Sequence, residues 1–282
     1  MPKVLSTSAL CSALALGGLS TPLWAQDQTR RVEGLDFDQI VVLGDAEVEI
    51  SQGKQVELQL RGPADYLDTE PFYVSDDTLV VGARKRRNKD DEQLRFRIVL
   101  PYLEDLQVKG SGTVYLKPFA FDDVVGNDPV TLTVDGSGEI NAFDLSGVDV
   151  EIRVEGSGDF RAVSIEAKDL EAVVAGSGYL FVETLKAENG EFVVTGSGDL
   201  RVTEGGSVDE LEVNIVGSGD IRMAGVNSNR AATNIVGSGS ATIGEVRDLL
   251  SASILGSGDV SYSGSPEVES VELGSGEVRR RD

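Results

Sequence analysis

Val174-Ala175-Gly176-Ser177-Gly178-Tyr179-Leu180 is one copy of the pattern that decides the fold of this 282-residue chain. The first glycine of the Gly-Ser-Gly tripeptide recurs at Gly110, Gly136, Gly156, Gly176, Gly196, Gly217, Gly237, Gly256 and Gly274. Successive copies are separated by 26, 20, 20, 20, 21, 20, 19 and 18 residues. A spacing this regular is typical of repeat proteins, in which one supersecondary unit stacks on the next.

Apolar residues flank the tripeptide at fixed distances. Valine or isoleucine stands two residues before the first glycine in every copy except the last, where Glu272 takes this place. The positions four before, four after and six after the first glycine are mostly apolar too, and polar residues such as Thr131 and Thr133 lie between them. This alternation indicates strands with one buried face. Each repeat therefore predicts a strand, Gly-Ser-Gly, a second strand and a short polar connection such as residues 187–190.

If each repeat forms one coil of a stack, the apolar residues at equivalent positions of successive repeats lie in line with one another. Like residues of successive coils would lie about 4.8 Å apart, and the inward side chains would fill one continuous core. We therefore predict an all-β parallel β-helix (β-solenoid) with about 20 residues per coil. The glycines would supply positive φ or close backbone approach at a corner. Gly-Ser-Gly can also close a hairpin, so a β-prism or a meander sandwich is the alternative fold.

Composition excludes several classes of function. The net charge of −23 is opposite in sign to that of a nucleic-acid-binding protein. The chain has no His and a single Cys, Cys11, which lies in the predicted signal peptide described below. Thiol nucleophiles, His-based triads and His-ligated metals are therefore excluded from the mature chain.

The first 25 residues have the pattern of a secretory signal peptide. Lys3 is followed by a mostly apolar run, and Leu23-Trp24-Ala25 ends in the small residue that cleavage requires. We predict cleavage between Ala25 and Gln26 and an exported protein, in the periplasm, on the cell surface or secreted, without a disulfide to stabilise it. The sequence predicts no transmembrane segment, because no later run approaches about 20 apolar residues.

The mature chain divides into four predicted segments. A polar leader covers residues 26–31, irregular β coils that act as an N-terminal cap cover 32–108, regular Gly-Ser-Gly repeats cover 109–278, and a polar tail covers 279–282. The long first step leaves room for an insertion at 119–129, predicted to be a loop. An uncovered coil end would expose unpaired backbone groups, which offers a route to self-association.

Three stretches resemble a known family. They are Phe37 to Val42 with Val48-Glu49-Ile50 and Gly53, then Pro101 to Gly112, and then the Gly-Ser-Gly-Asp/Glu series. Over residues 34–278 the chain resembles the head domains of autotransporter adhesins called GIN domains. The resemblance implies a right-handed parallel β-helix in an exported bacterial protein. The sequence predicts no C-terminal translocator barrel within these residues, which departs from the autotransporter part of that name.

The residue after each Gly-Ser-Gly is often acidic, so a solenoid would stack these carboxylates along one corner. Oxygen ligands about 4.8 Å apart could hold Ca²⁺, the only cofactor that the sequence suggests. Alternatively, these residues are solvated or pair with arginines two places on, such as Arg161, Arg201 and Arg222. The candidate metal ladder is Asp159, Asp199, Asp220 and Asp259.

Two groups of side chains are candidates for ligand binding. Tyr115, Tyr179 and Phe181 are predicted to point outward, where aromatic rings can stack on sugars or proteins. Arg84, Arg86 and Arg87 belong to a basic run that could dock an anionic partner, or else form a solvated hairpin tip.

We therefore predict an exported, non-enzymatic β-helix that serves as a binding or adhesion module of the bacterial cell envelope and recognises a glycan or a protein. The alternatives are a polysaccharide-active enzyme (lyase or hydrolase) and a purely structural spacer. A cleft with converging carboxylates and a basic residue would favour the enzyme, whereas uniform ladders without a cleft favour the module.

Overall fold

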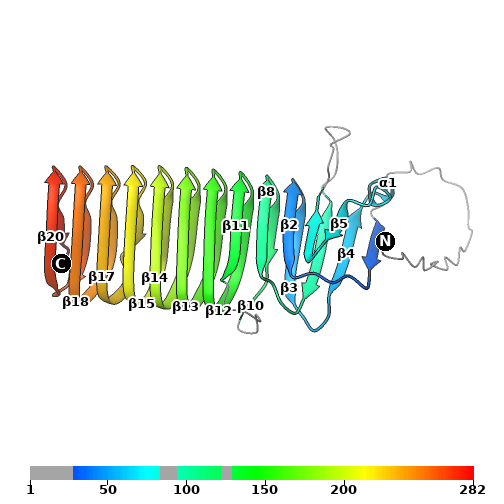
Figure 1. Ribbon diagram of the computed structural model, residues 1–282, viewed down its shortest axis with the longest axis horizontal. Helices are drawn as coiled ribbons and strands as arrows, with labels where there is room; N and C mark the ends of the chain where they lie inside the picture. Colours follow the sequence, from blue (N-terminus) through cyan, green and yellow to red (C-terminus); the bar gives the residue numbers. More distant parts are fainter. Residues whose placement is uncertain (1–27, 83–93, 122–128) are drawn as a thin grey trace, which may run out of the picture.

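The computed structural model describes residues 28–82, 94–121 and 129–282, and arranges them as a long stack of β coils (Figure 1). This confirms the predicted fold class, a β-solenoid. Within the described residues, no helix is both long enough and apolar enough to cross a membrane.

The regular coils are single strands that bend. Each strand runs from one Gly-Ser-Gly to the next and pairs with its neighbours in parallel, in register at every Gly-Ser-Gly. These strands are β12 (Glu139–Gly156), β13 (Asp159–Gly176), β14 (Tyr179–Gly196) and β15 (Asp199–Gly217). Residues 187–190, predicted to be a connection, instead continue β14, because Ala187 and Gly190 face the core and pair with Val208 and Leu211.

Two bends divide each coil into three walls. In β14 the inward side chains alternate along the strand, except between Val182 and Leu185 and between Ala187 and Gly190, where two outward residues intervene. The first wall follows Gly-Ser-Gly (179–182), the second is short (184–187), and the third (189–196) returns to the next Gly-Ser-Gly. The inward columns of all three walls form one continuous apolar core.

The Gly-Ser-Gly corner joins the third wall to the first wall of the next coil. Gly196 has φ +114°, and a Cβ there would lie 2.5 Å from the carbonyl oxygen of Gly176 in the preceding coil. The second glycine, Gly198, is buried, and its Cβ would lie 2.6 Å from Val174 Cγ1. The first glycine is therefore required by its backbone conformation, and both are required by the close stacking of coils.

The N-terminal coils do not stack in chain order. A coil made by β2 (Gln39–Gly44) and β3 (Glu47–Gln52) pairs on one side with β8 (Asp105–Gly110) and β9 (Thr113–Leu116). On its other side it pairs with β6 (Thr78–Val81) and β7 (Arg95–Leu100), which follow it in sequence. The coil at 39–52 is thus enclosed between two later coils.

Antiparallel elements cover the N-terminal end of the stack (Figure 1). β4 (Glu57–Gly62) pairs with β7, β1 (Gln28–Val32) pairs with β4, and β5 (Phe72–Ser75) pairs with β6. The single-turn helix α1 (Ala64–Leu67) lies against this end, where Arg30 Nη1 donates a hydrogen bond to the Leu67 carbonyl at 3.2 Å.

The predicted insertion at 119–129 begins inside the coil. β10 (Phe119–Ala120) pairs in parallel with β12, and β11 (Val130–Gly136) then pairs with both β8 and β12. The rings of Phe119 and Phe121 are buried and stack at 5.2 Å between centroids. The start of this segment is therefore core rather than loop, and residues 122–128 lie outside the described residues.

The C-terminal coils are less regular. They consist of β16 (Ile221–Met223), β17 (Val226–Gly237), β18 (Ala241–Gly256), β19 (Val260–Gly264), β20 (Glu267–Gly274) and β21 (Val278–Arg280). In β20, Glu272 stands opposite the buried Ile254 of β18, and all eight residues of β20 are exposed. β21 includes Arg279 and Arg280, which the sequence assigned to a tail.

We expect Gly196→Ala to lower the free energy of unfolding by at least about 2 kcal/mol, because the alanine would combine a strained φ with a clash against the preceding coil. Ser197→Ala, at the exposed middle of the same corner, should change it by about 0.5 kcal/mol or less. Urea unfolding of both variants measures the difference, and equal effects would contradict the close-stacking account.

One carboxylate lies partly buried at the start of a wall. Asp105 Oδ2 accepts a hydrogen bond from Gln107 Nε2 at 2.5 Å, while Asp105 Oδ1 is buried without a hydrogen-bond partner. Burial raises the pKa of the Asp105 carboxyl above its ordinary value of 3.8, although the Gln107 bond opposes the shift. The folded state therefore binds this proton more tightly than the unfolded chain does. The resulting stabilisation is complete below pH 3.8 and is lost as the pH rises through the raised pKa.

We accordingly expect Asp105→Asn, which cannot ionise, to raise the thermal midpoint at pH 7 and to reduce the gain in midpoint between pH 7 and pH 5. Asp209→Asn, at an exposed site on β15, is the matched control and should leave that gain unchanged. Calorimetry at both pH values provides the test, and an unchanged pH dependence in Asp105→Asn would contradict it.

Candidate functional site

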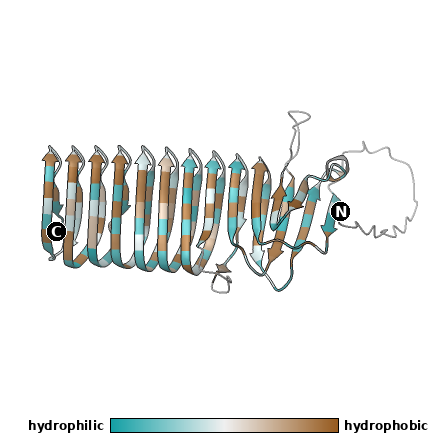
Figure 2. Ribbon diagram, in the orientation of Figure 1, coloured by the Kyte–Doolittle hydropathy of each residue, from teal (hydrophilic) through white to brown (hydrophobic). Residues whose placement is uncertain are grey.

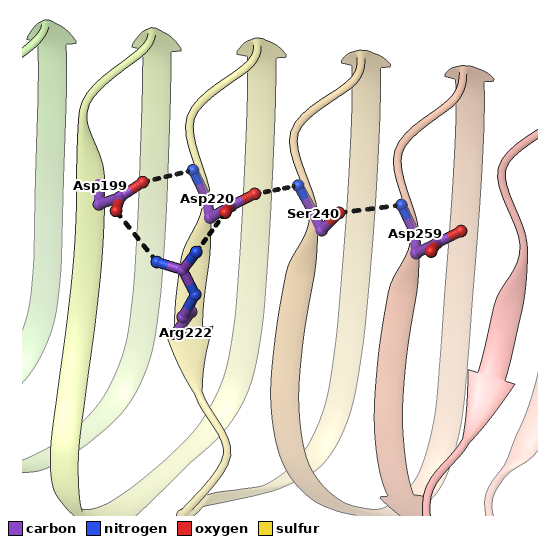
Figure 3. A network of polar contacts seen from close by, with 5 residues as sticks. All are labelled: Asp199, Asp220, Arg222, Ser240 and Asp259. Atoms are coloured by element: carbon purple, nitrogen blue, oxygen red, sulfur yellow. Dashed lines mark hydrogen bonds and ion pairs between the residues drawn. The ribbon is translucent and has the colours of Figure 1, made fainter.

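Three residues of the predicted aspartate ladder, Asp199, Asp220 and Asp259, form a chain of hydrogen bonds with Ser240 along the start of the first wall (Figure 3). Asp199 Oδ1 accepts from the backbone N–H of Asp220 at 3.0 Å, and Asp220 Oδ1 accepts from that of Ser240 at 2.7 Å. The Ser240 hydroxyl then accepts from the N–H of Asp259 at 3.3 Å. The side chains thus follow the stacking direction and bond successive coils together.

Arginines engage the other carboxylate oxygens of these aspartates. Arg222 lies between Asp199 and Asp220, at 3.0 Å and 2.5 Å from their Oδ2 atoms (Figure 3). Arg161 pairs with Asp159 at 2.8 Å and also with Glu139, and Arg279 pairs with Asp259 at 2.7 Å. Asp159 and Asp220 therefore each have a guanidinium partner two places further along the chain, whereas Asp199 and Asp259 each have one on the next coil. Among the described residues, no three His, Cys, Asp or Glu side chains are grouped to hold a metal ion.

Exposed aromatic side chains gather on the outer surface of the first wall and at the bend that follows it, on β9, β12 and β14, and the exposed Val163 lies on β13 between them. Buried neighbours alternate with them, as Val114 and Leu116 do around Tyr115. Tyr179 is 55 % exposed and Phe181 is half-buried on the same strand. We call this surface the aromatic face, which consists of Tyr115, Phe143, Val163, Tyr179 and Phe181.

Strand register places polar groups within the aromatic face. Asn141 pairs with Tyr115 on one side and with Arg161 on the other, and Arg161 pairs with Phe181. Lys117 lies at the edge, with its Nζ 4.8 Å from the centroid of the Phe143 ring. The face therefore offers flat apolar rings around an amide and a guanidinium, both of which can donate hydrogen bonds.

A groove of about 580 Å³ runs along the start of the third wall, across β12 to β18. Its floor includes Leu170, Gly190 and Leu211. Two stacked columns of mostly acidic side chains form its sides, and they include Asp149, Asp169 and Glu210 in one column and Glu171, Glu191 and Glu212 in the other. We call it the acidic groove.

Neighbouring side chains pair with several carboxylates of the acidic groove. Glu171 lies 3.1 Å from Arg153, and Glu210 lies 3.4 Å from Arg230. Burial raises the pKa of Glu171, with Arg153 opposing the shift, and burial together with repulsion from Asp169 raises the pKa of Asp149. The groove thus combines carboxyl groups that hold protons more tightly than usual with a basic residue, Arg230.

The structure brings together some predicted site residues and leaves others outside. Tyr115, Tyr179 and Phe181 share one face, as outward residues of the same wall must. The basic run of Arg84, Arg86 and Arg87, and the cleavage site at Ala25 and Gln26, lie outside the described residues.

Sequence reasoning missed Phe143 and the acidic groove. Phe143 stands seven residues after its first glycine, where the alternation breaks at a bend, so its direction could not be inferred from period two. The groove carboxylates stand five and seven residues before each first glycine. Comparing those two columns across the repeats would have revealed the acidic stripe.

The family described as "Putative auto-transporter adhesin, head GIN domain" matches residues 36–205 and 162–266. The chain belongs to this family. The match covers most of the chain, and it agrees with the GIN-domain resemblance of its repeats and opening strands. No curated protein matches the chain.

Crystal structures of similar fold include two from Parabacteroides species. A "Putative lipid binding protein" from Parabacteroides distasonis ATCC 8503 is 23 % identical over 92 % of this chain and 98 % of its own, with a TM-score of 0.68. A "putative adhesin" from Parabacteroides merdae ATCC 43184 is 18 % identical with the same coverage and TM-score. At these identities the likeness establishes the solenoid fold alone.

Calcium binding by the aspartate ladder remains a prediction, and Arg222 provides a way to test it. Ca²⁺ bound between Asp199 and Asp220 would compete with Arg222, so Arg222→Gln should bind Ca²⁺ more tightly than the unmodified chain. A ligand specific to the folded state raises the thermal midpoint by mass action. We expect a Ca²⁺-dependent rise that is larger in Arg222→Gln. No rise in either protein, relative to EDTA, would contradict calcium binding.

Proposed function

We propose that this chain is a non-enzymatic adhesion module of the bacterial cell envelope that binds a glycan on its aromatic face. The family description and the name of the Parabacteroides merdae neighbour both refer to adhesins, which supports binding to a surface partner outside the cytoplasm. The predicted signal peptide supports export.

The gathering of exposed rings on one face is the observation that carries the choice of ligand. Tyr115, Tyr179 and Phe181 lie on the first wall, and Phe143 and Val163 lie at the bend beside it. Exposed apolar side chains thus gather on neighbouring coils around Asn141 and Arg161. Sugar rings present apolar C–H faces that stack on aromatic rings and hydroxyls that accept hydrogen bonds. Asn141 and Arg161 stand where those hydroxyls would lie.

The solenoid suits this role mechanically. Adjacent coils are joined by backbone hydrogen bonds along every wall, so the positions of the rings are set by the strand spacing of about 4.8 Å. Sites built on regular strands are more precise than sites on loops. A polymer that lies along or across the coils could therefore contact several rings at once.

The acidic groove favours a second candidate, a polysaccharide-active enzyme. It contains two carboxyls with a raised pKa, Asp149 and Glu171, and one arginine, the combination that glycoside cleavage can use. Incubating the protein with a polysaccharide panel and measuring new reducing ends tests this candidate. Cleavage that disappears in Glu171→Gln would support it, and no cleavage of any polysaccharide would leave the binding module as the better account.

For the binding module, we expect Tyr179→Ala and Phe181→Ala each to weaken glycan binding by about three- to tenfold, because an aromatic contact contributes about 0.5–1.5 kcal/mol beyond the area that it buries. Binding would be measured by calorimetry or biolayer interferometry, after an array of envelope glycans has identified a ligand.

Tyr102→Ala is the matched control for this experiment. Tyr102 is an exposed tyrosine that precedes β8 and is not part of the aromatic face, so its loss should leave affinity unchanged. Equal loss in all three variants, or binding of a protein but of no glycan, would contradict a glycan site on this face.

A further inference from the structure

The outer edge of β20 carries no strand. Among the described residues, β20 pairs only with β18 and β21 pairs only with β19, so the last coil is covered on one side. In Figure 1 this coil ends the stack, opposite the end that carries β1, β4 and α1. An edge of this kind presents a row of backbone N–H and C=O groups that can pair with another strand.

Exposed apolar side chains lead up to this edge. The residue before the first glycine of each repeat points outward; it is charged in the first three repeats and becomes apolar toward the C-terminus. The apolar ladder is formed by Val216, Val236, Leu255 and Leu273. Leu273 is 63 % exposed and its neighbour on β20, Val271, is 60 % exposed, and Figure 2 shows hydrophobic strand ends on these last coils.

The inward face of β20 is polar. In every earlier repeat but one, the residues four and two places before the first glycine are both apolar. Ser270 and Glu272 stand opposite Ala252 and Ile254 of β18. Another coil of the regular type would place apolar side chains over Glu272 and leave its charge unpaired, which is costly. A strand that pairs with this edge must therefore combine apolar outward residues with a polar inward partner for Glu272.

We propose that the outer edge of β20 is a dimerisation surface, and that its occupant is β20 of a second copy. The two strands would run antiparallel about a two-fold axis through Val271. This register keeps outward residues opposite outward residues, so Val271 meets Val271 of the second copy. Leu273 of each copy lies diagonally next to Val271 of the other and directly opposite its Glu269. On the inward side, each Glu272 carboxylate lies opposite the Ser270 hydroxyl of the second copy, which can donate a hydrogen bond to it.

Other registers of the same pairing are worse. An axis through Glu272 would place two like charges opposite each other on the inward face. An axis through Ser270 would leave no apolar outward pair, because Val271 and Leu273 would both face acidic residues, and it would place Glu272 opposite Val268 instead of Ser270. A shift by one residue would set outward side chains against inward ones. The sequence of β20 is therefore self-complementary at one register.

The asymmetry of the two ends makes the assembly a closed dimer. A head-to-tail contact would have to join β20 to the antiparallel cover at the N-terminal end, whereas a contact between two C-terminal ends uses the same surface twice and stops there. The aromatic face lies on β9 to β14, away from β20, so a dimer would carry two such faces and bind a repetitive surface with avidity.

Cysteine cross-linking tests the register directly, in a Cys11→Ser background that removes the natural cysteine. Residues directly opposite in an antiparallel pair have Cα atoms about 4.5–5.5 Å apart, within the reach of a disulfide. Val271→Cys should therefore form a disulfide-linked dimer under mild oxidation. Glu269→Cys, on the same strand and face, should form at least tenfold less, because two residues 269 would be separated by about 13 Å along the strands.

Sedimentation tests dimerisation without a new disulfide. We expect the full chain to approach twice the monomer mass as its concentration rises. Val271→Lys, which sets two like charges opposite each other on the axis, should weaken dimerisation by at least tenfold. Val148→Lys, the same substitution at an exposed site on β12, is the control and should dimerise normally, and thermal unfolding checks that both variants fold.

A monomer at every concentration would overturn the proposal. So would equal cross-linking at positions 269 and 271, or a dimer that Val271→Lys does not weaken. Pairing of this edge with a strand of a different protein, while the chain alone stays monomeric, would also overturn it, because the occupant would then not be a second copy. Glycan binding by monomeric protein is measured separately, so failure of either proposal leaves the other intact.

Discussion

Close backbone stacking at the Gly-Ser-Gly corner is the constraint on which the rest of the structure depends. The carbonyl oxygen of each first glycine accepts a hydrogen bond from the serine N–H of the next coil, as Gly176 does from Ser197 at 2.9 Å. A Cβ at Gly196 or Gly198 would clash with atoms of the preceding coil. Because every coil turns at Gly-Ser-Gly, each corner restores the register even where a coil contains a bulge, and one column of residues becomes one ladder along the stack.

Register converts sequence columns into surfaces. The aspartates after Gly-Ser-Gly become a hydrogen-bonded chain with Arg222 between two of them, so charges that would repel in isolation are paired. Outward rings such as Tyr179 become part of a flat face, and the carboxylates beside Leu170 become the sides of a groove. The same stacking therefore produces two kinds of ladder. Where neighbouring coils supply hydrogen-bond or ion-pair partners, the ladder stabilises the solenoid; where they do not, its side chains are available to a ligand.

The two ends of the stack differ in whether other strands cover them. At the N-terminus, antiparallel strands and α1 cover the core, and the coil at 39–52 is enclosed by later coils. At the C-terminus, Glu272 occupies a core column and Val271 points outward beside an unpaired edge. Covering one end prevents open-ended stacking, whereas the other end keeps features of a contact surface.

The sequence by itself determined the solenoid, the coil length and the side of the sheet on which Tyr115, Tyr179 and Phe181 lie, because strand alternation and a fixed repeat are local properties that stacking preserves. It did not determine that residues 187–190 continue a strand, that Phe143 joins the aromatic face, or that Arg222 spans two carboxylates. Those features depend on where each coil bends, and the bends depend on how inward side chains of neighbouring coils pack together. The position of the coil at 39–52 between later coils is likewise decided by the tertiary structure. Strand pairing between segments that are distant in sequence produces no periodic pattern from which it could be predicted.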